Sequence, residues 1–178
     1  LTSPGTCGLN SSIMAMAVYH NKLYFSGFFS QTYDTSGIYP ALNMARWNDT
    51  VFSACGSFDG DFPLPLGAAL RFTIFQDKLI AGGYFTSING SPYGTYSGIA
   101  DYNDTSWSAL GNGFNNAVWS LTVFNGELYA GGEFTASRDG STPLNHIAKW
   151  TGTTWQQVGE GLNDTVMALT VDSVNNIL

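Results

Sequence analysis

The chain has 178 residues, enough for one domain with a buried core. Charged residues make up only 11%, well below the roughly 25% of an average globular protein, whereas aromatic residues reach 15% and there are 21 glycines. The net charge is −7 with no basic cluster, so we expect no nucleic-acid partner. The chain has no apolar run of about 18 residues, so we expect no membrane insertion by this segment.

One unit recurs along the chain. It has a β-branched residue, a glycine nine positions later and a phenylalanine two positions after that: Val18, Gly27 and Phe29; Ile74, Gly83 and Phe85; Val123, Gly132 and Phe134. After a loop of variable length come an Ala-x-aromatic triplet, a second aromatic residue and a glycine at fixed spacing. Such invariant spacing in three copies indicates a repeat architecture.

In chain order, residues 1–12 align with the end of a repeat, because CGLNSSIMAM (7–16) matches EGLNDTVMAL (160–169). Complete copies occupy 13–56, 69–111 and 118–159, and 166–178 begin another copy with VMALTV (166–171). The first copy has Ser26-Gly27 in place of Gly-Gly and is followed by extra residues within 57–68. The chain starts at Leu1 and stops inside a repeat, so we expect a piece of a longer propeller protein.

Each copy contains four segments typical of short strands, which in the third copy are 118–124, 127–134, 146–150 and 154–159. Asn125-Gly126 between the first two is a strong signal for a two-residue hairpin. No segment has a capped helical period. Four antiparallel strands repeated every 48–56 residues predict an all-β fold made of β-propeller blades, about three complete and the others partial.

Two features of the unit receive a structural interpretation. The double glycine is expected to allow close backbone approach and an unusual φ at the end of an inner strand. The recurrent Trp and Phe are expected to fill the space between neighbouring blades. The alternative for these rings, a stacking site for sugars, requires them to lie on an exposed rim.

The segment LYAGGEFTAS…HIAKWTGTTWQQVGEGLNDTVMAL resembles the kelch and galactose-oxidase-like propellers. More narrowly, it is similar to the repeats of the fungal cortical marker proteins for cell polarity. The resemblance implies a type of blade, and propellers host many activities. A copper site like that of galactose oxidase would need two His ligands, and His20 and His146 are predicted on opposite faces of the blades. We therefore predict no catalytic residue, no metal site, no cofactor and no enzyme activity.

Five Asn-x-Ser/Thr sequons are candidate N-glycosylation sites: Asn10, Asn48, Asn89, Asn103 and Asn163. Asn48 and Asn103 fall in the same predicted turn of two copies, and Asn10 and Asn163 in the same loop between copies. Asn89 has a proline just after its sequon and is the weakest candidate. Asn is also an ordinary turn residue, so a purely structural role remains open for each site.

The two cysteines, Cys7 and Cys55, are expected near one face of the same blade, within plausible bridging distance. A disulfide between them fits a secreted protein. Two buried free thiols would give the same sequence, and a bridge requires Cα atoms within about 7 Å.

The long loops 30–43, 87–97 and 136–145 are expected together on one face, where a rigid scaffold usually presents binding residues. The candidate binding residues in these loops are Tyr33, Asp34, Tyr39, Tyr93, Tyr96, Arg138 and Asp139. Solvated loop residues without a ligand are the alternative.

Together these features predict a non-enzymatic, extracellular or cell-surface scaffold. Its expected partners are proteins or glycans of the surface or matrix, and further blades of the same protein. Two other functions stay open. One is a carbohydrate-binding or carbohydrate-active propeller whose key residues lie outside this segment, and the other is a structural subunit of an extracellular filament or sheath.

Overall fold

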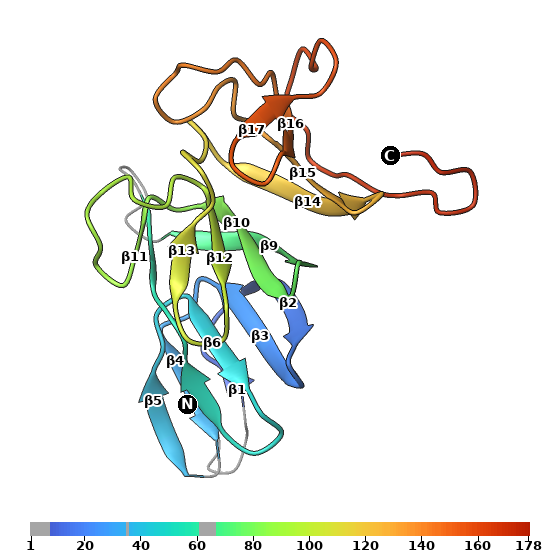
Figure 1. Ribbon diagram of the computed structural model, residues 1–178. Coiled ribbons are helices and arrows are strands. Elements are labelled where there is room, and N and C mark those ends of the chain that lie inside the picture. Colours follow the sequence, from blue (N-terminus) through green and yellow to red (C-terminus); the bar gives the residue numbers. More distant parts are fainter. Residues whose placement is uncertain (1–7, 35, 61–66) are drawn as a thin grey trace.

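The structure, a computed structural model, describes residues 8–34, 36–60 and 67–178. These residues form five antiparallel sheets and no helix, which confirms the all-β prediction (Figure 1). None of the five sheets closes into a barrel or a propeller within these residues.

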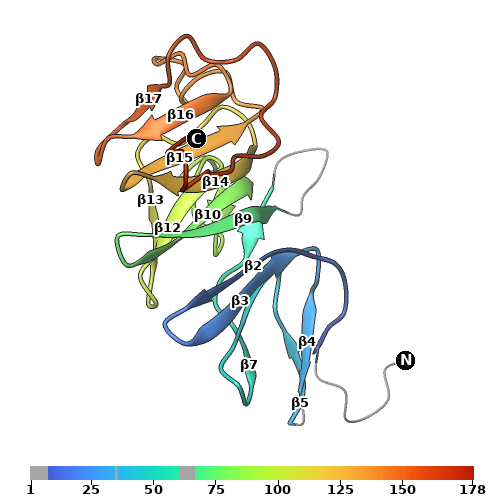
Figure 2. The same cartoon turned by 90° about the vertical axis from the view of Figure 1, so that its right-hand side faces the viewer.

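Three sheets of four strands follow one another along the molecule in chain order (Figure 2), and we call them repeat sheets 1, 2 and 3. Repeat sheet 1 has the order β2 (Ile13–Tyr19), β3 (Lys22–Gly27), β6 (Met44–Trp47), β7 (Phe52–Ala54). Repeat sheet 2 has the order β9 (Ala68–Phe75), β10 (Lys78–Tyr84), β12 (Ile99–Tyr102), β13 (Trp107–Ala109). Repeat sheet 3 has the order β14 (Val118–Phe124), β15 (Glu127–Gly132), β16 (Ile147–Trp150), β17 (Trp155–Gln157). The four strands predicted in the third copy are therefore confirmed.

The first two strands of each repeat sheet are joined by a two-residue turn in the left-handed region. Asn125 and Gly126 have φ of 50° and 77°, as the Asn-Gly signal predicts. In repeat sheet 2 the same turn is made by Gln76 and Asp77, with φ of 49° and 57°. Gln is less favourable in this region than Gly, Asn or Asp, so Gln76 carries some strain.

The second glycine of each copy is required by a close backbone approach. A Cβ on it would collide with a backbone carbonyl oxygen at the start of the first strand; the glycine and carbonyl pairs are Gly27 and Ser12, Gly83 and Ala68, Gly132 and Ala117. The register of each ladder shifts near this point, for example between Gly82 and Gly83. None of these glycines has a positive φ, so the expectation of an unusual φ is wrong and the close approach alone explains them.

Aromatic side chains fill the space between successive repeat sheets. Trp107 Nε1 donates a 3.0 Å hydrogen bond to the carbonyl of Cys55, at the end of the preceding copy. Trp155 repeats the contact with the carbonyl of Leu110 at 2.9 Å. Both indole rings are buried, so the structural interpretation of these aromatic residues is confirmed and they offer no exposed sugar platform.

Two small sheets form where the sequence predicts only loops. The segment 30–43 folds as a hairpin of β4 (Gln31–Asp34) and β5 (Gly37–Pro40), which β1 (Gly8–Leu9) extends to three strands. β8 (Phe58–Asp59) pairs with β11 (Ser87–Ile88) and so ties the segment after repeat sheet 1 to the loop of repeat sheet 2. These pairings could not be predicted, because the loop sequences lack the period of two that marks a longer strand.

The segment 166–171, predicted to begin a strand, is not one in the structure. It still contacts repeat sheet 3, because Val166 N donates to the carbonyl of Gly132 at 3.2 Å and Leu169 N donates to Ser120 Oγ at 2.7 Å. A strand assignment requires a ladder of backbone bonds, and this segment forms none with a described strand.

Candidate functional site

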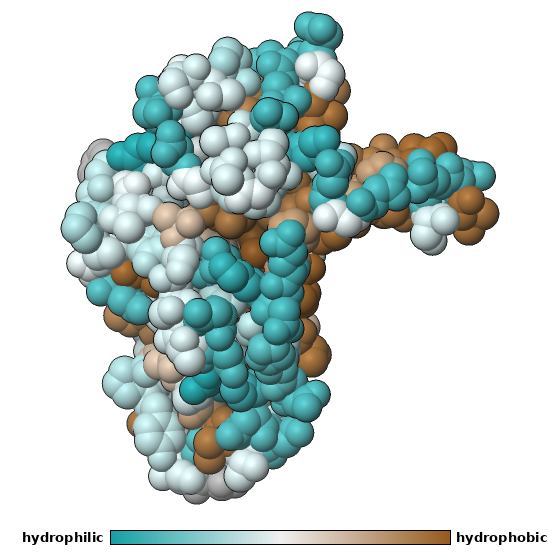
Figure 3. Space-filling model, viewed as in Figure 1, coloured by the Kyte–Doolittle hydropathy of each residue, from teal (hydrophilic) through white to brown (hydrophobic). Residues whose placement is uncertain are grey.

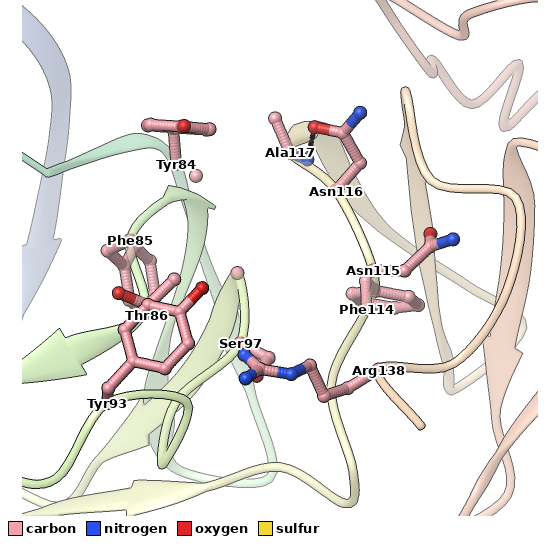
Figure 4. Close-up of a pocket in the computed structure, with 12 residues that line it drawn as sticks. Tyr84, Phe85, Thr86, Tyr93, Ser97, Phe114, Asn115, Asn116, Ala117 and Arg138 are labelled. Atoms are coloured by element: carbon pink, nitrogen blue, oxygen red, sulfur yellow. Dashed lines mark hydrogen bonds between the residues drawn. The ribbon is translucent and has the colours of Figure 1, made fainter. Parts of the chain in front are cut away.

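A polar cleft of 310 Å³ lies between repeat sheets 2 and 3 (Figure 4). One wall comes from the end of β10 and the loop after it, and the other from the linker before β14 and the loop after β15. The side chains that define it are Tyr84, Thr86, Tyr93, Asn115, Asn116 and Arg138. The cleft is therefore built by two successive copies, with loops from both.

Arg138 supplies the cation of the cleft. Its guanidinium carbon lies 4.9 Å from the centroid of the Tyr93 ring, and Nη1 donates a 2.9 Å hydrogen bond to Ser97 Oγ. The group lies directly against Gly94, where a Cβ would collide with it. No carboxylate among the described residues lies within ion-pair distance of Arg138. The arrangement can therefore accept an anion.

The backbone around Arg138 is held by two side chains. Asn115 Oδ1 accepts hydrogen bonds from the N–H groups of Thr135 and Ala136, at 2.9 and 3.2 Å. Asp139 Oδ1 accepts 2.7 Å hydrogen bonds from the hydroxyls of Ser137 and Ser141. These bonds lower the pKa of Asp139 to about 2, so its carboxylate stays ionised and the turn stays closed at neutral pH. The loop thus presents Arg138 from a fixed backbone.

Asn116 lies beside the cleft opening. Its Oδ1 accepts a 2.8 Å hydrogen bond from Ala117 N, and no hydrogen bond to another described residue uses its Nδ2. Figure 4 shows Tyr84 and Asn116 on opposite sides of the cleft, with Arg138 and Tyr93 at its other end. Neutral donors, aromatic rings and one cation therefore surround the same space.

The cleft includes only two of the predicted loop residues, Tyr93 and Arg138. Asp139 holds the turn beside it. The other four lie outside it: Tyr33, Asp34, Tyr39 and Tyr96. Asp34 is buried and accepts from the N–H groups of Ser36 and Phe52, and Tyr96 donates to the carbonyl of Trp107, so both have structural partners. The sequence analysis missed Tyr84, which ends β10, and Asn115 and Asn116, which lie just before β14, because none of them lies in a long loop.

A second polar cluster joins repeat sheets 1 and 2. Asp104, in the turn before β13, lies 2.7 Å from Lys22 Nζ and accepts a 2.6 Å hydrogen bond from the Tyr24 hydroxyl. Arg46 Nη1 lies 3.5 Å from the same carboxylate. Burial opposes ionisation, but the bonds from Lys22 and Tyr24 and the charges of Lys22 and Arg46 outweigh it and lower the pKa of Asp104. Both cations lie beside the same carboxylate, so we assign this cluster to sheet packing.

The outer face of β2 is apolar and exposed. Met16 and Val18 are 59% and 68% exposed, and Figure 3 shows hydrophobic atoms along the edge of the molecule beside β2. The repeat equivalent of Met16 is Leu121, which is 8% exposed and packs over Gly82 of the preceding copy. Met16 therefore lies exposed at a position that the third copy buries.

The sequons differ in what their side chains do. In Asn48 and Asn103 the Oδ1 atom caps the turn by accepting backbone N–H groups, and both residues are exposed. Asn10 clamps the N–H groups of Ser30 and Gln31 and also donates from Nδ2 to Ser30 Oγ, as Asn115 does in its copy. The two remaining candidates, Asn89 and Asn163, are exposed. Glycosylation stays a prediction at all five, and Asn48 and Asn103 leave Nδ2 without a hydrogen bond to a described residue.

The proposed disulfide involves Cys7, which lies outside the described residues. Cys55 is largely enclosed, and burial raises the pKa of its thiol to about 12. The two histidines lie at opposite strand ends: His20 in the turn between β2 and β3, and His146 just before β16. Within the part of the chain that the structure describes, no three metal-ligating side chains gather at one point. The same residues contain no helix long and apolar enough to cross a membrane.

No protein-family model matches the chain, and no curated protein matches it. Among solved structures it is similar to the computationally designed Ika8 protein, with 12% identity and a TM-score of 0.51. That match covers 93% of this chain and 42% of the Ika8 chain, so this chain spans less than half of that protein. The computationally designed Ika4 protein is similar with 11% identity and a TM-score of 0.52, over 97% of this chain and 88% of that one. At such identities the likeness concerns the fold alone.

Proposed function

We propose that the chain is part of a non-enzymatic, extracellular or cell-surface scaffold of β-propeller type, built from kelch-like repeats, that binds protein or matrix partners. One observation carries the proposal, namely that each copy packs on the previous one through the same positions. Val118 and Leu121 cover Gly82, and one copy later Val166 and Leu169 cover Gly131. A contact that recurs in this way propagates an array of sheets.

The exposed face of β2 fits such an array. Met16 corresponds to Leu121, and Ile13 corresponds to Val118, which is fully buried. A further sheet placed on β2 would remove apolar surface from water at roughly 25 cal/mol per Å². Isolated exposed apolar residues are ordinary, but a contiguous row on one strand marks an interaction surface.

The location outside the cell rests on the exposed turns that carry Asn48 and Asn103. These residues occupy the same turn in two copies and leave the amide nitrogen accessible. A glycan there would extend into solvent without disturbing either repeat sheet.

The test is a pair of charge substitutions in the natural protein. Met16→Asp places a carboxylate on the face of β2, whereas Val174→Asp places one at a site that is 89% exposed. We expect Met16→Asp to lower the unfolding midpoint or release an associated chain, and Val174→Asp to leave both unchanged. If Met16→Asp is as silent as Val174→Asp, the β2 face is bare and the array proposal fails.

A structural subunit of an extracellular filament is the second candidate, and one observation favours it. Ile13 and Met16 repeat the pattern of Val166 and Leu169, so β2 of a second copy could cover Gly131 in place of the segment 166–171. Such a head-to-tail contact does not close on itself unless its rotation forms a ring. Light scattering over a hundredfold range of concentration separates the two candidates, because only the filament grows with concentration.

A further inference from the structure

We propose that the cleft between repeat sheets 2 and 3 binds a sugar that carries a carboxylate, such as a uronic acid, with Arg138 as the group that pairs with the carboxylate. This site goes beyond the scaffold function, because it does not depend on how many sheets the full array contains. Its residues all lie within the second and third copies and the linker between them.

The first argument is the state of Arg138. The chain has six Lys and Arg against thirteen Asp and Glu, yet this cation has no described carboxylate in ion-pair range. Among the described residues only Ser97 forms a side-chain hydrogen bond with the guanidinium, through Nη1. The planar guanidinium keeps further donors for an anion, and a carboxylate matches their fork geometry.

The second argument is that the cation is prepositioned. The ring of Tyr93 supports one face of the guanidinium, and Arg138 N donates a 3.2 Å hydrogen bond to the carbonyl of Gly113. Asn115 and Asp139 fix the backbone on both sides. An anchor held in this way loses little side-chain freedom when a ligand binds.

The third argument concerns the rest of the lining. Thr86 and Tyr84 on the facing wall offer a hydroxyl and an aromatic ring, and Asn116 offers an amide at the other end of the wall that carries Arg138 (Figure 4). These are the groups that bind sugar hydroxyls and the apolar side of a sugar ring. The volume of 310 Å³ lies at the small end of ligand sites, which span about 300–1,000 Å³, so it suits one or two rings.

The experiment is a titration of the full 178-residue chain with methyl glucuronide, followed by backbone amide shifts, with neutral methyl glucoside as the comparison ligand. We expect saturable shifts for residues 84–98 and 113–117 with the glucuronide, and at least tenfold weaker binding of the glucoside. Affinity should fall as salt rises, because the pair is partly exposed to solvent.

Two variants that remove one positive charge separate the site from general charge effects. Arg138→Gln deletes the cation of the cleft, and Lys149→Gln deletes one that pairs with Glu127 outside it. We expect Arg138→Gln to weaken glucuronide binding at least tenfold and Lys149→Gln to change it less than twofold, both with the unfolding midpoint of the parent chain.

Several results would overturn the proposal. Equal binding of glucuronide and glucoside would remove the role of the carboxylate, and retained binding by Arg138→Gln would remove the role of Arg138. A response to acetate as strong as that to glucuronide would show that the cleft binds anions without a sugar. None of these results bears on Met16→Asp, so the scaffold proposal and this one fail separately.

Discussion

Ser26 Oγ accepts a 3.0 Å hydrogen bond from the backbone N–H of Ala69, and the two residues stand where other copies have glycine and valine. Gly82 lies under Val118, and Gly131 lies under Val166. At the contact between Ser26 and Ala69, the first residue is larger than glycine and the second is smaller than valine. The contact therefore has a similar total side-chain size although both side chains differ.

This exchange predicts that the two positions are energetically coupled. Ala69→Val alone should cost about 1–3 kcal/mol of unfolding free energy by overpacking, and Ser26→Gly alone about 1–3 kcal/mol because a buried N–H loses its acceptor. The double variant restores the glycine and valine pair, so its cost should be at least about 1 kcal/mol below the sum.

Urea unfolding of the parent chain, the two single variants and the double variant measures the coupling. Ser108→Gly, at an exposed position on β13, is the matched control, and its cost should simply add to that of Ala69→Val. If the unfolding free-energy costs of Ser26→Gly and Ala69→Val simply added, the two positions would not be coupled, which would contradict the exchange.

The cluster around Asp104 predicts a dependence of stability on pH. Its pKa is lower in the folded state than in the unfolded chain, so its contribution is complete above about pH 4 and is lost as the pH falls through the folded value. Asp104→Asn should lower the free energy of unfolding by about 1–2 kcal/mol at pH 7, because Lys22 and Arg46 lose their shared partner.

The measurement is denaturant unfolding from pH 7 to pH 2. The difference between parent and Asp104→Asn should shrink below pH 4, whereas Asp77→Asn, at an 86% exposed carboxylate that contacts His20, should change stability by less than about 0.5 kcal/mol at pH 7. A constant difference at all pH values would mean that the carboxylate is not the stabilising group.

A substitution in the turn of repeat sheet 2 should increase the stability of the protein. Gln76 is exposed and has φ of 49°, a conformation that Asn adopts more readily than Gln. We expect Gln76→Asn to raise the unfolding free energy by about 0.5 kcal/mol. Asn125→Gln, the reverse change in repeat sheet 3, should lower it by a similar amount, and a thermal scan of both variants tests the pair. The same sign for both changes would contradict the role of the turn.

The enclosed thiol of Cys55 should react slowly. With its pKa raised to about 12 by burial, little thiolate is present at pH 8, so iodoacetamide should label Cys55 far more slowly in the folded protein than in urea. Labelling without reductant also tests the bridge with Cys7. A disulfide blocks labelling of both residues even in urea, and fast labelling of Cys55 in the folded state would contradict its burial.

The sequence was most informative where the residues repeat. Alternating apolar positions and the Asn125-Gly126 turn locate the strands of repeat sheet 3 because local pattern determines them. The departure of Ser26 from glycine was also visible, but its partner Ala69 became meaningful only through their contact. Single residues on different copies carry no pattern that marks them as neighbours.

The cleft could not be predicted for a related reason. Arg138 and Ser97 are 41 positions apart, in loops that do not repeat between copies, and only tertiary structure brings them together. The hairpin of β4 and β5 was missed because its sequence is irregular. The expected strand at 166–171 failed because strand formation depends on a neighbouring strand and not on sequence alone.

The central claim is that the face of β2 is a surface between copies, and oxidation of methionine tests it directly. The natural protein is treated with dilute hydrogen peroxide, and mass spectrometry of its peptides gives the oxidation rate of each methionine. The urea-unfolded protein is the reference. Met44 is fully buried and sets the protected rate, whereas Met16 is 59% exposed on the β2 face. The account predicts that Met16 oxidises nearly as slowly as Met44, because another sheet covers it. Oxidation of Met16 at the rate of the unfolded protein would show that nothing covers the face and would contradict the account.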